Sequence, residues 1–354
     1  MSNSFRTIQD ILEASRRGDS LYSIYRRLEQ SEILLNEHQQ TAFEILSETL
    51  FHPFTEKQAQ ALVKFPTNSL DIYATTISLP IAQVLSQFDG KQVSLNRIQK
   101  IDKIVAKELA QFNCKELSLN GLKRLDKATI KALYQYKGER VSLDGLQQLD
   151  EATAKMLSRY KAYYLCLNGL QDFNEATAKA LGEFQGDLSL NGVQQLDEEV
   201  AKALAEFQGH SISLNGVKHL VEPVAKALAE FQGHSISLDG VNYIGEALTK
   251  ALAQFQGQDL SLNGVQQLDE GVAKELAQFK VERIFLDGVK EIDEATAKEL
   301  SQWKGQYLSF NGLEQIDEAV AKELGQFRNG ISATEKIKKK IQKYKLEFLR
   351  RKRR

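Results

Sequence analysis

The sequence predicts an α/β solenoid built from tandem units, each contributing one short strand and one short helix. Three observations support this prediction: a period of 24 residues, an alternating apolar segment that ends in Asn-Gly or Asp-Gly, and a capped amphipathic segment after each pair. The period is clearest in the aromatic residue that closes each unit, and every step is 24 residues except the 23 from Phe184 to Phe207. These aromatic residues are Phe88, Phe112, Tyr136, Tyr160, Phe184, Phe207, Phe231, Phe255, Phe279, Trp303 and Phe327.

Some neighbouring units are almost identical. Residues 200–217 and 224–241 differ at one position in eighteen, where Asn215 stands against Asp239. This similarity indicates that the array grew by tandem duplication. An earlier, degenerate copy of the unit is predicted to end at Phe65.

The strand of each unit is read from segments such as Ile212-Ser213-Leu214, in which apolar and polar residues alternate. A period of two is typical of a strand with one buried face. The pair that follows, such as Asn215-Gly216, is expected to turn the chain sharply, because Asn and Gly tolerate positive φ. A sharp turn after each strand therefore separates it from the next helix.

The helix of each unit follows a residue, usually Asp, whose carboxylate can accept hydrogen bonds from the free amides of the first turn. Within one helix Val200, Ala201, Leu204 and Phe207 fall on a single face, and Gly209 is expected to be a left-handed C-cap. One strand and one helix cannot bury a core alone, whereas stacked copies can. The predicted caps are Asp102, Asp126, Asp150, Asp197, Asp269, Asp293 and Asp317.

This L-x-L-N pattern with its periodic helix resembles the leucine-rich repeat family, especially short bacterial forms, over residues 54–330. The chain departs from the common consensus of the family because Asn or Asp follows the second leucine directly. The resemblance implies a curved, right-handed α/β leucine-rich-repeat solenoid of about eleven repeats, used mainly for protein recognition.

Both flanking segments are expected to close the solenoid, because terminal repeats expose a core face. Residues 1–53 predict a helical N-terminal cap, with an independent interaction module as the alternative. Residues 331–354 carry eleven Lys and Arg against two acids, while the rest of the chain has 35 basic and 45 acidic residues. Ser332 and Glu335 have the spacing of a capping box, so a helix is expected to start near Ala333.

Two interpretations of that basic helix stay open. Its apolar stripe (Ile337, Ile341, Tyr344 and Phe348) could dock on the last repeat, or the helix could meet anionic membrane or nucleic acid through residues 333–354. The two are compatible if the helix docks and only its far end reaches a polyanion. The candidate polyanion-binding residues are Lys338, Lys339, Lys340, Arg350, Arg351, Arg353 and Arg354.

The sequence carries no signature of an enzyme, a cofactor or a metal site. No phosphate-binding glycine motif is present, and most acidic residues fall in cap or helix-surface positions. His210 and His234 share one phase of neighbouring repeats, but no further ligand recurs there. Cys114 and Cys166 each replace a repeat residue. A catalytic site, a cofactor, a metal and a small-molecule substrate are therefore not expected.

The compartment is predicted from the start of the chain and from its hydropathy. The first residues lack the apolar segment of a signal peptide, and no apolar run reaches the length of about 18 residues that spans a bilayer. A cytoplasmic location is expected, with secretion by a route that needs no signal peptide left open.

Departures from the repeat indicate where a partner would bind. The outward strand position is serine in most units, which predicts a smooth polar stripe on the strand face, and Phe285 interrupts it next to Arg283 and Tyr307. The alternative is that the Phe285 ring folds onto a neighbouring strand. Arg140, Tyr163 and Tyr164 form a second irregular stretch, whereas repeats 189–264 show only Ser, Asp and Asn at the outward positions and are expected to act as spacers.

The leading hypothesis is therefore a non-enzymatic scaffold or adaptor that binds a partner protein through the strand face, near residues 140–164 and 283–307. One alternative is an adaptor held by its basic C-terminal segment on anionic membrane or nucleic acid. Another is a host-directed bacterial effector, which would use the same surface.

Overall fold

The computed structural model describes residues 54–64 and 67–352, so the cap expected for residues 1–53, the Phe65 at which the first copy is predicted to end, and Arg353 and Arg354 lie outside the described residues. The chain divides into two compact units, one ending at Leu170 and one beginning at Gln171. Each unit is a stack of strand–helix repeats, as the sequence predicts.

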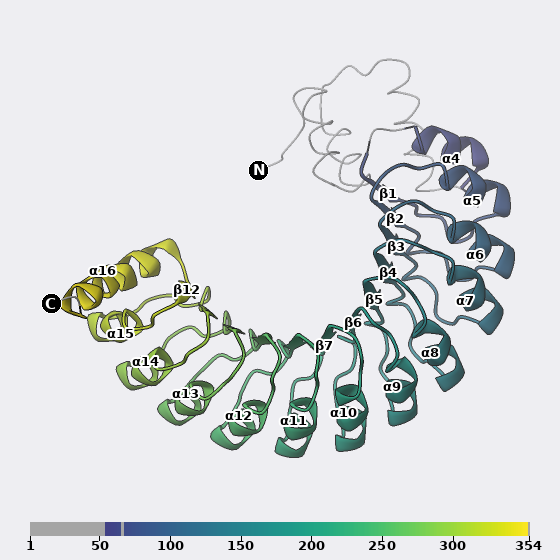
Figure 1. Ribbon diagram of the computed structural model, residues 1–354. Helices are drawn as coiled ribbons and strands as arrows, with labels where there is room; N and C mark the ends of the chain where they lie inside the picture. Colours follow the sequence, from purple (N-terminus) through teal and green to yellow (C-terminus); the bar gives the residue numbers. More distant parts are fainter. Residues whose placement is uncertain (1–53, 65–66, 353–354) are drawn as a thin grey trace, which may run out of the picture. The chain divides into compact units, whose positions relative to one another are not determined.

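In the first unit the strands pair in parallel and in chain order, from β1 to β5. Successive strands are joined by a helix, so the strands lie along one side of the unit and the helices along the other (Figure 1). The elements are α4 (Glu56–Leu62), β1 (Ser69–Asp71), α5 (Leu79–Leu85), β2 (Gln92–Ser94), α6 (Lys103–Leu109), β3 (Glu116–Ser118), α7 (Lys127–Leu133), β4 (Arg140–Ser142), α8 (Glu151–Leu157) and β5 (Tyr164–Cys166).

The second unit repeats this arrangement, with parallel pairing from β6 to β12. Its elements are α9 (Glu175–Leu181), β6 (Asp187–Ser189), α10 (Glu198–Ala205), β7 (Ser211–Ser213), α11 (Glu222–Leu228), β8 (Ser235–Ser237), α12 (Glu246–Leu252), β9 (Asp259–Ser261), α13 (Glu270–Leu276), β10 (Arg283–Phe285), α14 (Glu294–Ser301), β11 (Tyr307–Ser309), α15 (Glu318–Leu324), β12 (Gly330–Ser332) and α16 (Glu335–Lys352).

The core of each unit lies between the strands and the helices. The middle residue of each strand, such as Ile212 in β7, is buried, as are Val200, Ala201 and Leu204 on the inner face of α10. The closing aromatic residues form a stack of their own. Ring centroids of Phe207 and Phe231 are 6.1 Å apart, and those of Phe231 and Phe255 are 6.3 Å apart. The aromatic period read from the sequence is therefore the period of the core.

The predicted helix caps are confirmed. Each of the seven Asp residues accepts a hydrogen bond from a backbone N–H of the first turn, and Asn174 does the same for α9. The bond from the Thr153 N–H holds the pKa of the Asp150 carboxyl below its ordinary value. The side chain at the N-cap does not form this bond in three helices, where the cap is Ser78, Val221 or Gly245.

The glycines have a different role from the one expected. None of Gly145, Gly209 and Gly216 has the positive φ inferred from its sequence context, and α10 ends at Glu206 in a right-handed conformation. A Cβ on Gly216 would lie 2.2 Å from the carbonyl oxygen of Asn191 in the preceding repeat. A Cβ on Gly209 would meet the Phe207 ring at 2.4 Å. These positions need glycine because the stacked backbones and rings leave no room for a side chain.

The helix at the end of the second unit starts later than expected. Ser332 belongs to β12 instead of a capping box, and its hydroxyl donates to Asn311 of the preceding repeat. Helix α16 begins at Glu335 and packs along α15 (Figure 1). Ile337 and Ile341 are buried, while Tyr344 and Phe348 are half-buried. The apolar stripe therefore docks on the last repeat, as one of the two interpretations expected.

Candidate functional site

The strand serines belong to a hydrogen-bonded ladder, and Ser213, Ser237 and Ser261 are half-buried. Seven serine hydroxyls donate to the Asn or Asp side chain that follows the strand of the preceding repeat. In repeats such as those of β7 and β8, the backbone N–H of the next Asn or Asp donates to the same side chain. Several of these serines are buried, among them Ser309 at 1% exposure. The hydroxyl links run from Ser118 to Asn96, Ser142 to Asn120, Ser213 to Asn191, Ser237 to Asn215, Ser261 to Asp239, Ser309 to Asp287 and Ser332 to Asn311.

Side chains that differ from repeat to repeat stand at the first residue of each strand. This position is half-buried or exposed in most repeats, whereas the middle residue is buried. Because the strands are parallel and in register, first residues of neighbouring strands lie side by side, as Arg140 and Tyr164 do. Variation at this position therefore decides what the strand face offers to a partner.

In the first unit Arg140 and Tyr164 are register partners on β4 and β5, and Tyr163 directly precedes Tyr164; these three residues are called here the β4–β5 cluster. The guanidinium of Arg140 lies over the Tyr164 ring, 4.4 Å from its centroid, and its Nη1 donates to Sγ of Cys166 at 3.5 Å. Tyr164 is 40% exposed and Tyr163 is 65% exposed. The Nε of Arg140 is 4.0 Å from a carboxylate oxygen of Glu116, so this ion pair is at the limit of contact.

Tyr136 and Tyr160, which close their repeats, belong to the core, whereas Tyr134 is half-buried. Tyr136 is buried, and its hydroxyl donates to the carbonyl oxygen of Cys114 at 2.9 Å. Burial raises the pKa of Tyr136 and of Tyr160. The ring of Tyr134 packs edge-on against Tyr160, with centroids 6.1 Å apart. Of the five tyrosines in residues 134–164, Tyr163 and Tyr164 are the exposed ones.

In the second unit Arg283, Phe285 and Tyr307 lie on β10 and β11, where the structure pairs them differently. Arg283 binds the carboxylate of Asp259 through Nε and, at 2.6 Å, through Nη2. Phe285 is half-buried, and its ring centroid is 6.0 Å from that of Tyr307. The ring thus packs on the neighbouring strand, which was the alternative weighed for it.

Asp259 is a member of this group that sequence reasoning missed. It occupies the position of Arg283 in the preceding repeat, 24 residues earlier, and the two are register partners in the sheet. The repeat period contained the signal, since the residue 24 positions away is the neighbour on the adjacent strand. Because Asp259 neutralises Arg283, the charge offered to a partner here is smaller than the sequence suggested.

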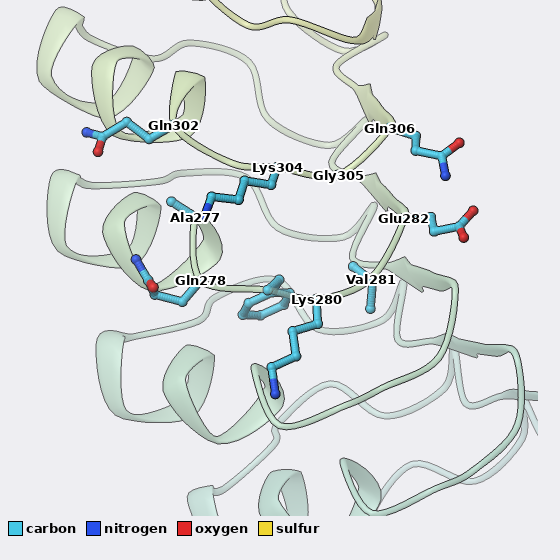
Figure 2. A pocket seen from close by; sticks show the side chains of 10 residues that line it. Ala277, Gln278, Lys280, Val281, Glu282, Gln302, Lys304, Gly305 and Gln306 are labelled. Atoms are coloured by element: carbon cyan, nitrogen blue, oxygen red, sulfur yellow. The ribbon is translucent and has the colours of Figure 1, made fainter.

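A pocket of about 550 Å³ lies beside this region, between the helix-to-strand segments 277–282 and 302–306. Figure 2 shows that Gln278 and Gln302 point toward the helix side and that Glu282 and Gln306 point toward the strands. Val281 stands where most repeats have a glycine such as Gly209. The lining is largely polar, unlike the mostly apolar sites that small ligands occupy.

The titratable residues singled out in the sequence are placed as follows. Burial raises the pKa of the Cys114 and Cys166 thiols, and Arg140 opposes this only in part at Cys166. His210 and His234 are exposed and side by side, with ring centroids 5.4 Å apart. Within residues 54–64 and 67–352, no group of three or more His, Cys, Asp or Glu side chains is arranged to hold a metal ion.

The basic residues of α16 differ in whether their charged groups have a partner. Lys338 pairs with Glu335, and Lys340 donates to the carbonyl oxygen of Ile316 at 2.7 Å, whereas Lys339 is exposed. Arg350 and Arg351 fall within α16. None of the helices in the described part of the chain is both long enough and apolar enough to cross a membrane.

Comparison with solved structures agrees with this architecture. The leucine-rich-repeat-containing protein LegL7 of Legionella pneumophila superposes with a TM-score of 0.53 at 13% identity, over 79% of this chain and 96% of that chain. The chain has the leucine-rich-repeat fold. Its described residues hold twelve such strand–helix repeats, and the fold class predicted from the sequence is confirmed.

Other solved leucine-rich-repeat structures match with lower scores. An internalin of Listeria monocytogenes has a TM-score of 0.40 at 16% identity, over 83% of this chain and 90% of that chain. A chain of the Toll–Spatzle complex of Drosophila has a TM-score of 0.48 at 12% identity, over 79% of this chain, which spans only 42% of that chain. No family model and no curated protein matches the sequence.

Proposed function

We propose that this leucine-rich-repeat chain is a non-enzymatic scaffold that binds a partner protein through its strand face, with the β4–β5 cluster as the principal contact. The observation that carries the proposal is the exposure of Tyr163 and Tyr164 beside Arg140. Tyrosine and arginine are enriched among the residues that dominate binding energy at protein interfaces. The repeats on either side carry no aromatic residue at the first strand position, which is Glu116 in β3 and Asp187 in β6.

The contacts of Arg140 favour this role. Stacking on Tyr164 restricts the guanidinium before a partner arrives, so less conformational entropy is lost on binding. Its contact with Glu116 is long, which leaves N–H donors of the guanidinium free for an acceptor on the partner. The residues near Phe285 contribute an aromatic surface in this proposal, while Arg283 serves mainly to hold Asp259.

The non-enzymatic part of the proposal rests on the state of the possible nucleophiles. Raised pKa values keep the Cys114 and Cys166 thiols protonated at neutral pH, and a protonated thiol is a poor nucleophile. The Asp carboxylates at the N-caps already accept backbone hydrogen bonds.

Site-specific photo-crosslinking tests the proposal in cells that make the protein. A photoreactive residue replaces Tyr163, and the matched control carries it at His234, which is also exposed and also immediately precedes a strand. We expect a discrete protein adduct from position 163 that is absent at position 234. Arg140→Ala with Tyr164→Ala should remove the adduct without changing the melting temperature.

Two results would reject the proposal. One is an adduct pattern that is the same at both positions. The other is a position-163 adduct that persists in the double variant.

A further inference from the structure

Helix α16 is fixed to the solenoid by the face that carries its apolar stripe. Ile337 and Ile341 are 1% and 4% exposed, and the helix packs along α15. Gly325 at the end of α15 permits this close contact, because a Cβ there would lie 2.9 Å from the backbone nitrogen of Lys345 and 3.0 Å from Cβ of Tyr344. The opposite face of α16 is therefore presented outward on a rigid support.

The outward face of α16 consists of Lys336, Lys339, Lys343 and Leu346, which is called here the α16 face. With 3.6 residues per turn these positions share the side opposite Ile337. All four are exposed, and Leu346 is 47% exposed. Among the described residues, no carboxylate pairs with Lys336, Lys339 or Lys343, whereas Lys338, Lys340 and Lys345 each have a partner. The helix as a whole carries nine basic and two acidic residues.

A small cavity of about 260 Å³ lies between α16 and the edge strand β12 and shares Lys339 with the α16 face. Its walls are the aliphatic side chains of Ile331 and Ile341 together with Lys338, Lys339 and Lys345. A cavity with isoleucine side chains inside and lysine ammonium groups at its edge suits a molecule that has an anionic part and an apolar part. A phospholipid, with its phosphate above its acyl chains, has this character.

We propose that the α16 face binds the surface of a membrane that contains anionic phospholipid. Clusters of four to eight Lys and Arg on a helix are typical of such binding, and nine are present here. The exposed Leu346 gains burial at a lipid interface but gains nothing from a phosphate backbone. An unstructured nucleic-acid strand would be expected to need exposed aromatic rings for base stacking, and Tyr344 is half-buried.

The mode of binding follows from the docked stripe. Because Ile337 and Ile341 are buried against the solenoid, α16 cannot insert its apolar side into the bilayer as a free amphipathic helix does. The helix adsorbs by charge, with Leu346 reaching the interface. Binding is therefore expected to fall steeply with ionic strength, since exposed charges are screened by salt.

Sedimentation of the full chain with vesicles tests this proposal, using phosphatidylcholine vesicles with and without phosphatidylserine. Binding should require phosphatidylserine, and Lys336→Gln, Lys339→Gln and Lys343→Gln together should weaken it about 100-fold, at roughly fivefold for each residue. A charge-matched control replaces three exposed lysines of other helices, Lys226, Lys250 and Lys274, by Gln and should bind like the wild type. Leu346→Ala should weaken binding about tenfold.

Three outcomes would overturn the proposal. The full chain could fail to sediment with phosphatidylserine vesicles at low salt. The two triple variants could bind equally. Duplex or single-stranded DNA could bind more tightly than vesicles, with Leu346→Ala having no effect on either, which would assign the face to nucleic acid. Equal melting temperatures of all variants would show that the changes act on binding and not on folding.

Discussion

Removal of one side chain from the ladder should measure how strongly neighbouring repeats are held together. Oδ1 of Asn215 accepts from the Ser237 hydroxyl at 2.7 Å and from the Asp239 backbone N–H at 2.9 Å. Asn215→Ala deletes both bonds, and a net contribution of about 1 kcal/mol for each gives a loss of about 2 kcal/mol in the free energy of unfolding. Urea denaturation followed by circular dichroism at neutral pH would measure the loss.

Two variants serve as internal standards for this measurement. Ser237→Ala removes only the hydroxyl link and should lose about 1 kcal/mol. Asp239→Asn keeps an acceptor oxygen, and the almost identical preceding repeat already has Asn215 in this position, so a change within about 0.5 kcal/mol is expected. If Asn215→Ala were no more destabilising than Ser237→Ala, the bonds to Asn215 would not be additive contributors and the ladder would not hold the repeats together.

Three further predictions concern the packing and capping of the repeats. Gly145→Ala should lower the free energy of unfolding by about 3 kcal/mol or more, because the added Cβ would lie 2.1 Å from the carbonyl oxygen of Asn120. Thermal unfolding would measure this loss, and only a small loss would show that the turn can move to accommodate the side chain. Trp303→Phe should cost about 1–3 kcal/mol in a denaturant titration, since the buried carbonyl of Phe279 loses the indole N–H at 3.0 Å. Asp150→Asn should keep the helix cap but make the stability depend less on pH in acid. The lowered pKa of the Asp150 carboxyl stabilises the fold at pH values above the ordinary carboxyl pKa of 3.8. This contribution disappears as the pH falls through the pKa of the folded state. An unchanged acid profile in the Asn variant would contradict that assignment.

The repeat itself could be predicted because every level of the sequence agrees on it. The aromatic period, the strand alternation and the Asp caps independently give the same 24-residue frame, and the structure places Phe207, Ile212 and Asp197 as that frame requires. A fold can be predicted from its sequence when local signals agree with one another in this way.

The glycines show where this reasoning fails. Gly next to Asn is a good predictor of positive φ in an isolated turn, but at Gly216 the constraint comes from Asn191 in another repeat. The φ preference of Asn-Gly is a property of the local chain, whereas the close approach of two backbones arises only when the repeats stack. The same limit misplaced the start of α16, since Ser332 has the spacing of a cap in the sequence but lies in β12, which pairs with β11.

The candidate sites were predicted in part. The sequence singled out Arg140, Tyr163 and Tyr164; the structure stacks Arg140 on Tyr164 and leaves Tyr163 and Tyr164 exposed, while their role in binding stays a prediction. The sequence did not show that Arg283 is neutralised, because ion pairing depends on which strand position faces which neighbour. A comparison of residues 24 positions apart would have revealed it. On α16, the run of three lysines drew notice, yet the outward face depends on the direction from which α15 approaches.

Cys166 and Phe285 occupy the strand position that serine holds in most repeats, so neither offers the hydroxyl that elsewhere joins one repeat to the one before it. Cys166 lies on the same strand as the exposed Tyr164, and Phe285 lies on the same strand as the exposed Arg283. The strands that we propose for recognition are thus also the strands where the ladder is interrupted, a trade between function and stability. Fraying under mild denaturant should begin at these two seams, and the segments that open most readily would be those with which the protein meets its partner.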